Sequence, residues 1–276
     1  MQGYPAPAKL NLFLHVVGRR PDGYHLLQTV FRFIDYGDVV HLGVRNDGQI
    51  VRLHELAGVP EDRDLTVRAA RLLQAESGTA RGADILLEKR LPQGGGLGGG
   101  SSDAATVLLA LNRLWRLNWP RRRLQELAVT LGADVPVFVF GQAAFAGGIG
   151  DILQPVSLQP AWYVVLTPPI GVSTAQVFAA PELTRDTPPI KITDFSAGVG
   201  RNDLLPIVLS RSREVAKHLN WLKAFGDARL TGSGACVFLE VPDRAAGQTV
   251  LAQLPSDMQG FIAAGLDRHV LYDLAA

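Results

Sequence analysis

The chain reads Leu-Pro-Gln-Gly-Gly-Gly-Leu-Gly-Gly-Gly-Ser-Ser-Asp-Ala-Ala from Leu91 to Ala105, with six glycines in the seven residues 94–100. Glycine costs roughly 0.5–1 kcal/mol more than alanine wherever the backbone is ordered, so packing does not explain this run. Such a loop leaves its backbone N–H groups free to approach an anion closely. Ser101, Ser102 and Asp103 are residue types that cap a helix, and apolar residues at helical spacing follow them. A glycine loop that leads into a helix N-terminus predicts a phosphate-binding site.

Several known phosphate loops can be compared with this stretch. The Walker loop requires a lysine where Gly100 stands, which excludes it. Gly94, Gly96 and Gly99 do match the Gly-x-Gly-x-x-Gly pattern of dinucleotide-binding proteins. However, Pro120 opens a second predicted helix where a Rossmann unit requires its second strand. A protein-kinase loop requires His-Arg-Asp and Asp-Phe-Gly downstream, and the sequence contains neither. A glycine-rich surface turn without a ligand is the other alternative.

Composition limits the possible partners. With 276 residues and 47% hydrophobic side chains, the chain can form two domains with a substantial core. The net charge of +1 argues against a field that would attract nucleic acid or an anionic membrane. Cys236 is the only cysteine, so no disulfide framework or cysteine-based metal site is expected, which fits a reducing compartment. No leader peptide or membrane-spanning run is visible in the sequence, and we expect a cytoplasmic protein with no membrane partner.

Hydrophobic periodicity predicts a mixture of strands and helices in the first half of the chain. Alternation over residues 10–16 predicts a strand with Lys9 and Asn11 on one face. Residues 35–38 are expected to reverse the chain between two strands, and Asn46-Asp47-Gly48 is a strong hairpin signal. Asp64 can cap a helix. The other predicted elements are strands at 28–34, 39–44, 50–53 and 83–91, and helices from the glycine loop to about 118 and over 121–131.

The pattern changes after residue 151. We expect strands at 162–166 and 235–240, helices near 203–209 and 215–225, and a long proline- and glycine-rich loop from about 179 to 200. This mixture of hairpins and helices predicts an α+β fold. We place the domain boundary near residue 157, with an N-terminal domain over 1–157 and a C-terminal domain over 158–276.

Further motifs accompany the glycine loop in a fixed order along the chain. They are Pro7-Ala8-Lys9-Leu10-Asn11-Leu12, Asp22-Gly23-Tyr24-His25, Leu131-Gly132-Ala133-Asp134-Val135-Pro136 and Thr231-Gly232-Ser233-Gly234-Ala235-Cys236. Together with Pro-x-Gly-Gly-Gly-Leu-Gly-Gly-Gly-Ser-Ser, they resemble the GHMP kinases, which include galactose, homoserine and mevalonate kinases. The resemblance implies a two-domain kinase with its active site in the cleft between the domains, ATP as phosphate donor and Mg²⁺ as metal. The motifs do not indicate the ligands of the metal or the oligomeric state.

The resemblance also narrows the substrate. The motifs are most similar to those of family members that phosphorylate the 2-hydroxyl of a cytidine diphosphate-linked methylerythritol, in the non-mevalonate route to isoprenoids. Another GHMP kinase, acting on homoserine, mevalonate or a sugar, is the nearest alternative. A non-catalytic nucleotide-binding protein on the same scaffold is the alternative of another class.

The resemblance implies catalytic roles for two residues, Asp134 and Lys9. Asp134 would be the general base that takes the hydroxyl proton, although it could instead cap the helix that Pro136 opens. Lys9 would lie beside Asp134 and stabilise charge, although a lysine on an apolar strand could instead extend to solvent. The presence of both argues against a protein that only binds nucleotide.

The remaining site residues divide between nucleotide and substrate. The predicted ATP-binding residues are Pro92, Gln93, Gly94, Gly95, Gly96, Leu97, Gly98, Gly99, Gly100, Ser101 and Ser102, closed by Gly232-Ser233-Gly234, which could also be an ordinary turn. The predicted substrate-binding residues are Asn11, Tyr24, His25, Thr174 and Phe178. His25 would read the cytosine edge, while Tyr24 and Phe178 would stack on the base; packing is the alternative for each ring, and Asn11 could be a satisfied strand residue.

Two positions depart from the pattern of many relatives. Asp103 stands where asparagine is common, and its charge so near a triphosphate is expected to weaken nucleotide affinity. Gly147 stands where relatives often carry a larger side chain. Neither departure changes the predicted family.

Overall fold

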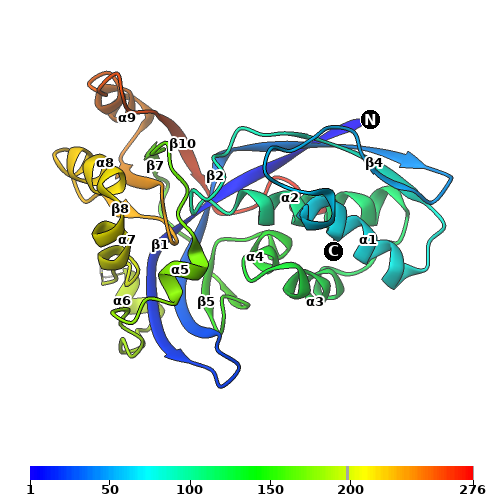
Figure 1. Cartoon of the computed structure of the whole chain (residues 1–276), viewed down its shortest axis with the longest axis horizontal. Coiled ribbons are helices and arrows are strands. Elements are labelled where there is room, and N and C mark those ends of the chain that lie inside the picture. The colour runs from blue at the N-terminus through cyan, green and yellow to red at the C-terminus, as the bar shows by residue number, and fades with distance from the viewer. Residues whose placement is uncertain (197–198, 276) are drawn as a thin grey trace.

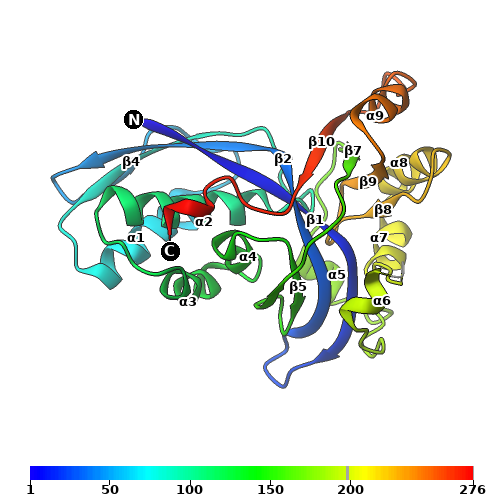
Figure 2. The same ribbon diagram turned by 180° about the vertical axis from the view of Figure 1, so that it is seen from behind.

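The computed structural model describes residues 1–196 and 199–275. Two lobes lie side by side and share a long pair of antiparallel strands, β1 (Gln2–Arg19) and β2 (His25–Arg45), as Figures 1 and 2 show. Within the described residues the strands form one ten-stranded sheet, whose main path runs β3-β4-β2-β10-β7-β9-β8. The predicted α+β class is therefore confirmed.

The first lobe consists of the sheet end that carries β4 and the helices that cover it (Figure 1). Its helices pack around a core to which α2 contributes most of its length. The elements are β3 (Ile50–Arg52), a 3₁₀ turn (Glu61–Arg63), α1 (Leu65–Ser77), β4 (Gly82–Glu88), α2 (Gly99–Leu114), α3 (Arg121–Leu131), α4 (Val135–Phe140), β5 (Ala144–Gly147) and β6 (Ile152–Pro155).

The second lobe packs helices against the other end of the sheet, around a separate hydrophobic core. Its elements are β7 (Trp162–Leu166), α5 (Thr174–Phe178), α6 (Ile192–Ser196), α7 (Leu205–Arg211), α8 (Arg213–Lys223), β8 (Arg229–Leu230), β9 (Val237–Val241), α9 (Arg244–Leu251), β10 (Gly260–Leu266) and a 3₁₀ turn (Tyr272–Leu274). Among the described residues, no helix is long and apolar enough to cross a bilayer.

The chain crosses between the lobes more than once. Leu14 and Val16 of β1 pack in the core of the second lobe, whereas Leu271 and Leu274 near the C-terminus pack against the core of the first. A third buried cluster, which includes Leu10 and Tyr163, joins the two. A cut at residue 157 thus separates segments that pack together, and the boundary stays a prediction.

The predicted reversal at residues 35–38 is wrong, because β2 continues through it as one strand. Gly37 permits this, since a side chain there would lie 2.2 Å from the Ala6 carbonyl oxygen of β1. The predicted hairpin at Asn46-Asp47-Gly48 is also wrong. β4 pairs with β2 over Val39–Arg45, so that edge is occupied and β3 instead pairs with β4 in parallel.

The helix after the glycine loop differs at both ends from the prediction. It begins at Gly99, so Ser101, Ser102 and Asp103 lie within α2 and none of them is the N-cap. The N-cap is Gly98, which is in the left-handed conformation and has no side chain that could cap the helix. The helix ends at Leu114 because Arg116 turns the chain with a positive φ.

Other elements agree with the sequence analysis. Asp64 caps α1, accepting a hydrogen bond from the Thr66 N–H, and α3 and β7 span the expected residues. The short helix α6 and strands β5, β6 and β10 were not predicted, nor was α9. The predicted loop 179–200 contains α6, and residues 197 and 198 lie outside the described ranges.

Candidate active site

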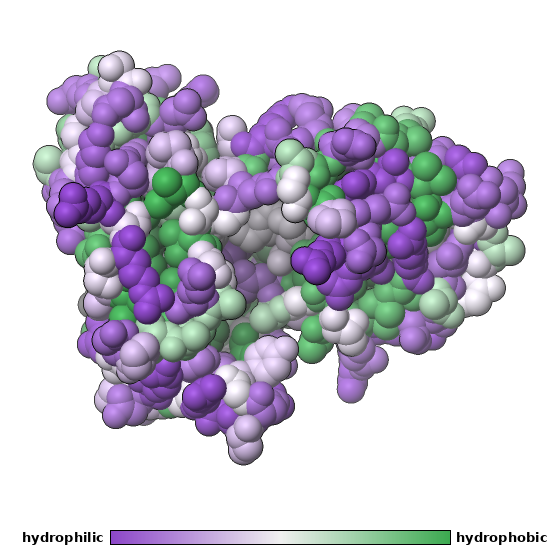
Figure 3. Space-filling model, in the orientation of Figure 1, coloured by the Kyte–Doolittle hydropathy of each residue, from purple (hydrophilic) through white to green (hydrophobic). Residues whose placement is uncertain are grey.

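A cavity of about 590 Å³ lies between the two lobes, where the surface in Figure 3 is hollowed. Residues 92–101 of the glycine loop form one wall of it. Strand β1, the start of α4, helix α5 and the turn 232–234 contribute polar residues of the predicted motifs. Thr29, Arg63, Asp64, Thr66, Lys89 and Asp103 add further polar groups. The cavity therefore brings together all the sequence motifs except Asp22-Gly23-Tyr24-His25, in agreement with a site between lobes.

The glycine loop is held by backbone contacts on both sides. Gly94, Gly96 and Gly98 have φ values of 67°, 75° and 72°, which favour glycine. The Leu97 carbonyl accepts a hydrogen bond from the Lys9 N–H at 3.0 Å, and the Gly94 and Gly95 carbonyls accept from residues 235 and 236. This anchoring orients the N-terminus of α2 toward the cavity, where its first N–H groups can receive phosphate oxygens.

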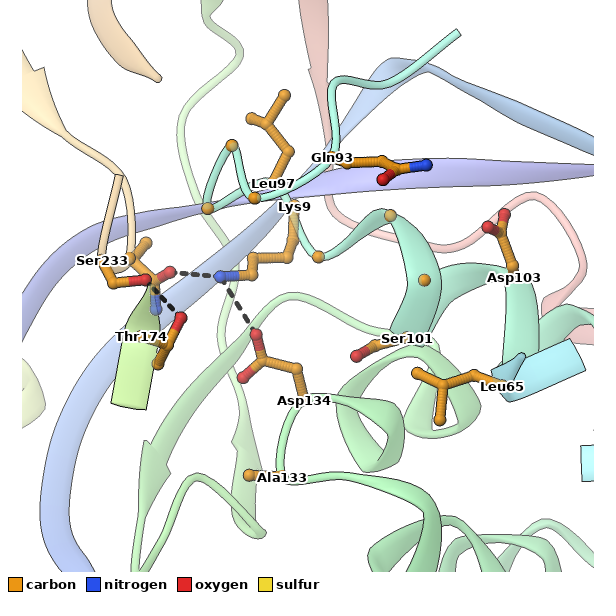
Figure 4. Close-up of a pocket in the computed structure, with 18 of the residues that line it drawn as sticks. Lys9, Leu65, Gln93, Leu97, Ser101, Asp103, Ala133, Asp134, Thr174 and Ser233 are labelled. Atoms are coloured by element: carbon orange, nitrogen blue, oxygen red, sulfur yellow. Dashed lines mark hydrogen bonds and ion pairs between the residues drawn. The ribbon is translucent and has the colours of Figure 1, made fainter. Parts of the chain in front are cut away.

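Lys9, Asn11 and Asp134 all line this cavity. Figure 4 shows the Lys9 ammonium group directed toward the Asp134 carboxylate. The Lys9 Nζ lies 3.2 Å from the Asp134 Oδ2 and donates a hydrogen bond to the Asn11 Oδ1 at 2.5 Å. Lys9 is buried, so it does not extend to solvent, whereas the Asp134 side chain is 37% exposed. Asp134 does occupy the N-cap position of α4, but its side chain makes no capping hydrogen bond there.

The two adjacent serines of α2 have different surroundings. Ser101 lines the cavity, with its hydroxyl on the same side as the Asp134 carboxylate (Figure 4). Ser102 is buried and does not line the cavity; its Oγ donates a hydrogen bond to the Pro7 carbonyl at 2.7 Å. Ser102 therefore ties α2 to β1, and a direct contact with phosphate would require this bond to break.

The predicted substrate residues are only partly assembled. Thr174 and Phe178 of α5 line the cavity, and the Thr174 Oγ1 lies 2.7 Å from the Ser233 Oγ. His25 is not one of the residues that line the cavity, but its ring packs against that of Phe178, which does, with ring centroids 5.0 Å apart. Tyr24 is 59% exposed on the β1–β2 turn and lies outside the cavity. The structure thus places Tyr24 apart from the other predicted residues.

Sequence reasoning missed an apolar part of the cavity. Leu56, Val59, Leu65 and Leu87 come from β4 and from the segment before and at the start of α1. Their spacing carries no motif, and Leu56, Val59 and Leu65 are distant from the glycine loop in sequence. Ligand sites are commonly lined by apolar residues with a few placed polar groups, so this wall suits the flat, apolar part of a ligand.

A mostly buried charge cluster beside the glycine loop was also missed, and two of its members, Lys89 and Asp103, line the cavity. Lys89 forms ion pairs with Asp38 and with Asp103, the latter at 3.0 Å. Asp38 accepts hydrogen bonds from the Arg90 and Leu91 N–H groups, which fixes the approach to the loop. Lys89 thus gives Asp103 a countercharge, and we expect this countercharge to reduce the predicted weakening of nucleotide affinity.

Burial raises the pKa of Asp103 to about 7, although the Lys89 ammonium lowers it. In the unfolded chain an aspartate titrates near 4, so the native state binds more protons between about pH 4 and 7. The stabilising contribution of Asp103 therefore falls as the pH rises through this range. We expect Asp103→Asn to remove this dependence, so that the variant gains stability relative to the native protein between pH 5 and pH 8.

Urea unfolding of both proteins at pH 5 and pH 8 measures this difference. Asp273→Asn, which changes a carboxylate that is 89% exposed, is the control and should leave the pH dependence unaltered. An identical change in unfolding free energy for Asp103→Asn and the native protein would contradict the prediction.

A two-lobed α+β protein whose cavity combines a glycine loop, a helix N-terminus and a lysine–aspartate pair has the features of a small-molecule kinase. Known proteins agree with this class. The family model for "GHMP kinases N terminal domain" matches residues 64–142, and the family model for "GHMP kinases C terminal" matches residues 191–260. The chain belongs to the GHMP kinase family.

Its relatives include proteins named 4-diphosphocytidyl-2-C-methyl-D-erythritol kinase. The one from Thiobacillus denitrificans is 66% identical over 272 residues, which cover 99% of this chain and 98% of the relative. The one from Nitrosospira multiformis is 62% identical, covering 98% and 93%. A crystal structure of 4-(cytidine 5'-diphospho)-2C-methyl-D-erythritol kinase matches with a TM-score of 0.82 at 32% identity, covering 96% and 99%. Mevalonate kinase from Methanococcus jannaschii, with a TM-score of 0.71 and 14% identity, shares the fold.

Proposed function

We propose that this kinase transfers the γ-phosphoryl group of ATP to the 2-hydroxyl of 4-diphosphocytidyl-2-C-methyl-D-erythritol, a step of the non-mevalonate route to isoprenoids. The observation that carries the reaction is the Lys9–Asp134 pair, 3.2 Å apart in the cavity that the glycine loop lines. The substrate is supported by the full-length relatives that are named for it.

The chemistry follows from the position of Asp134. Its carboxylate takes the proton of the substrate hydroxyl while the hydroxyl oxygen forms a bond to the γ-phosphorus. The bond between that phosphorus and the β-phosphate oxygen breaks, and ADP leaves. The Lys9 ammonium stabilises the charge that collects on the transferred group, and Asn11 holds the ammonium in place.

The glycine loop and the N-terminus of α2 are proposed to hold the triphosphate, residues 93–101 through backbone N–H groups and Ser101 also through its hydroxyl. Pro92 has no N–H and would contribute only its ring to the wall of the cavity. The predicted contact of Ser102 with phosphate is not part of this proposal, since its hydroxyl donates to the Pro7 carbonyl and its backbone N–H donates to the Gly98 carbonyl. The turn Gly232-Ser233-Gly234 would close this part of the site.

Mg²⁺ is proposed as the metal that neutralises the phosphate charge. It prefers phosphate oxygens, water and one or two protein oxygens, so a preformed cluster of protein ligands is not required. The residues present fit this requirement, because the Ser101 hydroxyl reaches the cavity at the N-terminus of α2, beside the proposed phosphate site. When bound with ATP, the metal would supply electrostatic stabilisation of the transferred phosphoryl group.

The cytidine end is proposed to lie beside Phe178 and His25. Phe178 lines the cavity and offers a ring face to the base, while Thr174 and Ser233 offer hydroxyl groups nearby. Tyr24 could stack on the base only if the exposed β1–β2 turn moved inward, because its side chain is outside the cavity.

A substrate panel tests the proposed function. Purified protein with MgATP should release ADP much faster with the cytidyl substrate than with homoserine, mevalonate or galactose. Equal rates across the panel would overturn the substrate assignment, and no ADP release with any of them would favour a protein that only binds nucleotide.

Replacing Phe178 with alanine should raise KM for the cytidyl substrate by roughly tenfold, because a base–aromatic stack contributes about 1–3 kcal/mol. KM for ATP should stay nearly unchanged. Steady-state kinetics with each substrate varied in turn measures both constants, and an equal rise in both would place Phe178 outside the cytidine site.

A further inference from the structure

We propose that Arg185 is a positioning residue that holds His25 in the tautomer with its proton on Nδ1, and thereby favours a base whose ring nitrogen accepts a hydrogen bond. This inference rests on the proposed function, since it concerns the recognition of the cytidine base. It adds a residue that none of the sequence motifs includes and assigns a defined protonation state to His25.

The hydrogen bond between these side chains determines the tautomer. Arg185 lies in the segment that follows α5, and its Nε donates to the His25 Nε2 at 3.1 Å. A guanidinium is a donor only and does not lose its proton in proteins, so the Nε2 atom must be the acceptor. A neutral imidazole that accepts at Nε2 carries its hydrogen on Nδ1.

The guanidinium is itself held firmly. Its terminal nitrogens donate to the carbonyl oxygens of Phe178 at 3.1 Å, Ala180 at 2.6 Å and Leu183 at 2.9 Å, with a longer bond of 3.4 Å to Pro181. Arg185 therefore joins the end of α5 to His25 at the start of β2. It fixes the histidine ring against the Phe178 ring, which lines the cavity.

The charges around His25 favour the same neutral state. Burial lowers the pKa of His25, and the positive charges of Arg185 and Arg19 lower it further. Arg185 approaches from the segment after α5, and Arg19 from the neighbouring strand β1, where it is the registered partner of His25. A second proton would both break the bond to Arg185 and add a third positive charge.

The Nδ1–H group distinguishes between pyrimidine bases. The N3 atom of cytosine has a lone pair and accepts a hydrogen bond, whereas the N3 atom of uracil carries a hydrogen and cannot accept one. A histidine fixed as a donor therefore matches cytosine and leaves the N3–H of uracil unpaired. Leaving a polar group unpaired is costly, and this cost provides the discrimination.

The experiment compares the native protein with Arg185→Met and with Arg211→Met as matched control. Arg211 also donates to a backbone carbonyl of α5, that of Gln176 at 2.9 Å, but has no contact with His25. KM and kcat are measured with the cytidine diphosphate-linked substrate, its uridine analogue and ATP. Nitrogen-15 NMR of labelled histidine, assigned with His25→Gln, reports the tautomer and the pH at which the ring gains its second proton.

For Arg185→Met we expect KM for the cytidyl substrate to rise about tenfold, the magnitude of one lost hydrogen bond, with KM for ATP within twofold. The preference for cytidine over uridine should fall by a similar factor. The His25 signal should change from the Nδ1–H tautomer toward a mixture and titrate at higher pH. Arg211→Met should change none of these.

A native His25 signal with its proton on Nε2 would overturn the proposal, and so would an unaltered cytidine preference in Arg185→Met. A rise in KM that is equal for ATP and the cytidyl substrate would show general distortion of the site and would also overturn it. If the native protein did not phosphorylate the cytidyl substrate, the proposed function would fail, whereas the NMR spectrum would still decide the tautomer.

Discussion

Asp134→Asn should lower kcat by about 10²–10⁴-fold, because this substitution removes the group proposed to accept the hydroxyl proton while keeping its shape. The amide retains a carbonyl oxygen for the Lys9 ammonium, so the fold should be preserved. KM for ATP should change little, since the glycine loop holds the nucleotide through other residues. Steady-state release of ADP with saturating cytidyl substrate measures the loss.

The chain offers a matched control for this variant. Asp267 pairs with the buried Arg32 at 3.3 Å and is 40% exposed, against 3.2 Å and 37% for Asp134 with Lys9, but Asp267 does not line the cavity. Asp267→Asn should therefore leave kcat near the native value. Near-native turnover by Asp134→Asn would contradict the assignment of the base.

Gly96→Ala should both destabilise the protein and weaken ATP binding by more than tenfold. Gly96 has a φ of 75°, where an L-residue costs roughly 1–2 kcal/mol. An added Cβ would lie 2.2 Å from the Thr231 carbonyl oxygen, so the backbone must shift at a further cost of about 1–3 kcal/mol. The displaced segment is the wall proposed to hold the triphosphate. Urea unfolding and a titration with an ATP analogue measure the two effects.

Gly147→Ala is the control for Gly96→Ala. A Cβ at Gly147 would meet nothing within 4 Å, so the stability of this variant should change by less than about 0.5 kcal/mol. If Gly96→Ala were as stable as Gly147→Ala and bound the analogue normally, the close packing of the loop would have no functional role.

The sequence by itself determined the features that depend on local pattern. The glycine run and the apolar helix after it predicted a phosphate loop, and alternation along β1 placed Lys9 and Asn11 on one face, where both reach the cavity. The motifs in order along the chain identified the family. The shared face and the family are confirmed, whereas phosphate binding by the loop stays a prediction. Local sequence carries these signals because backbone freedom, periodicity and motif spacing are properties of short segments.

Only the tertiary structure decided how these segments meet. The long strand β2 overrode a turn signal because β1 pairs along it, and β4 occupied the edge that the predicted hairpin required. The packing against β1 turned Ser102 away from the cavity, and the position of the β1–β2 turn left Tyr24 in solvent. The Asp38–Lys89–Asp103 cluster and the Arg185–His25 bond join residues 14 to 160 positions apart. Such contacts depend on which surfaces pack together and which polar groups are then buried, and local sequence does not encode this.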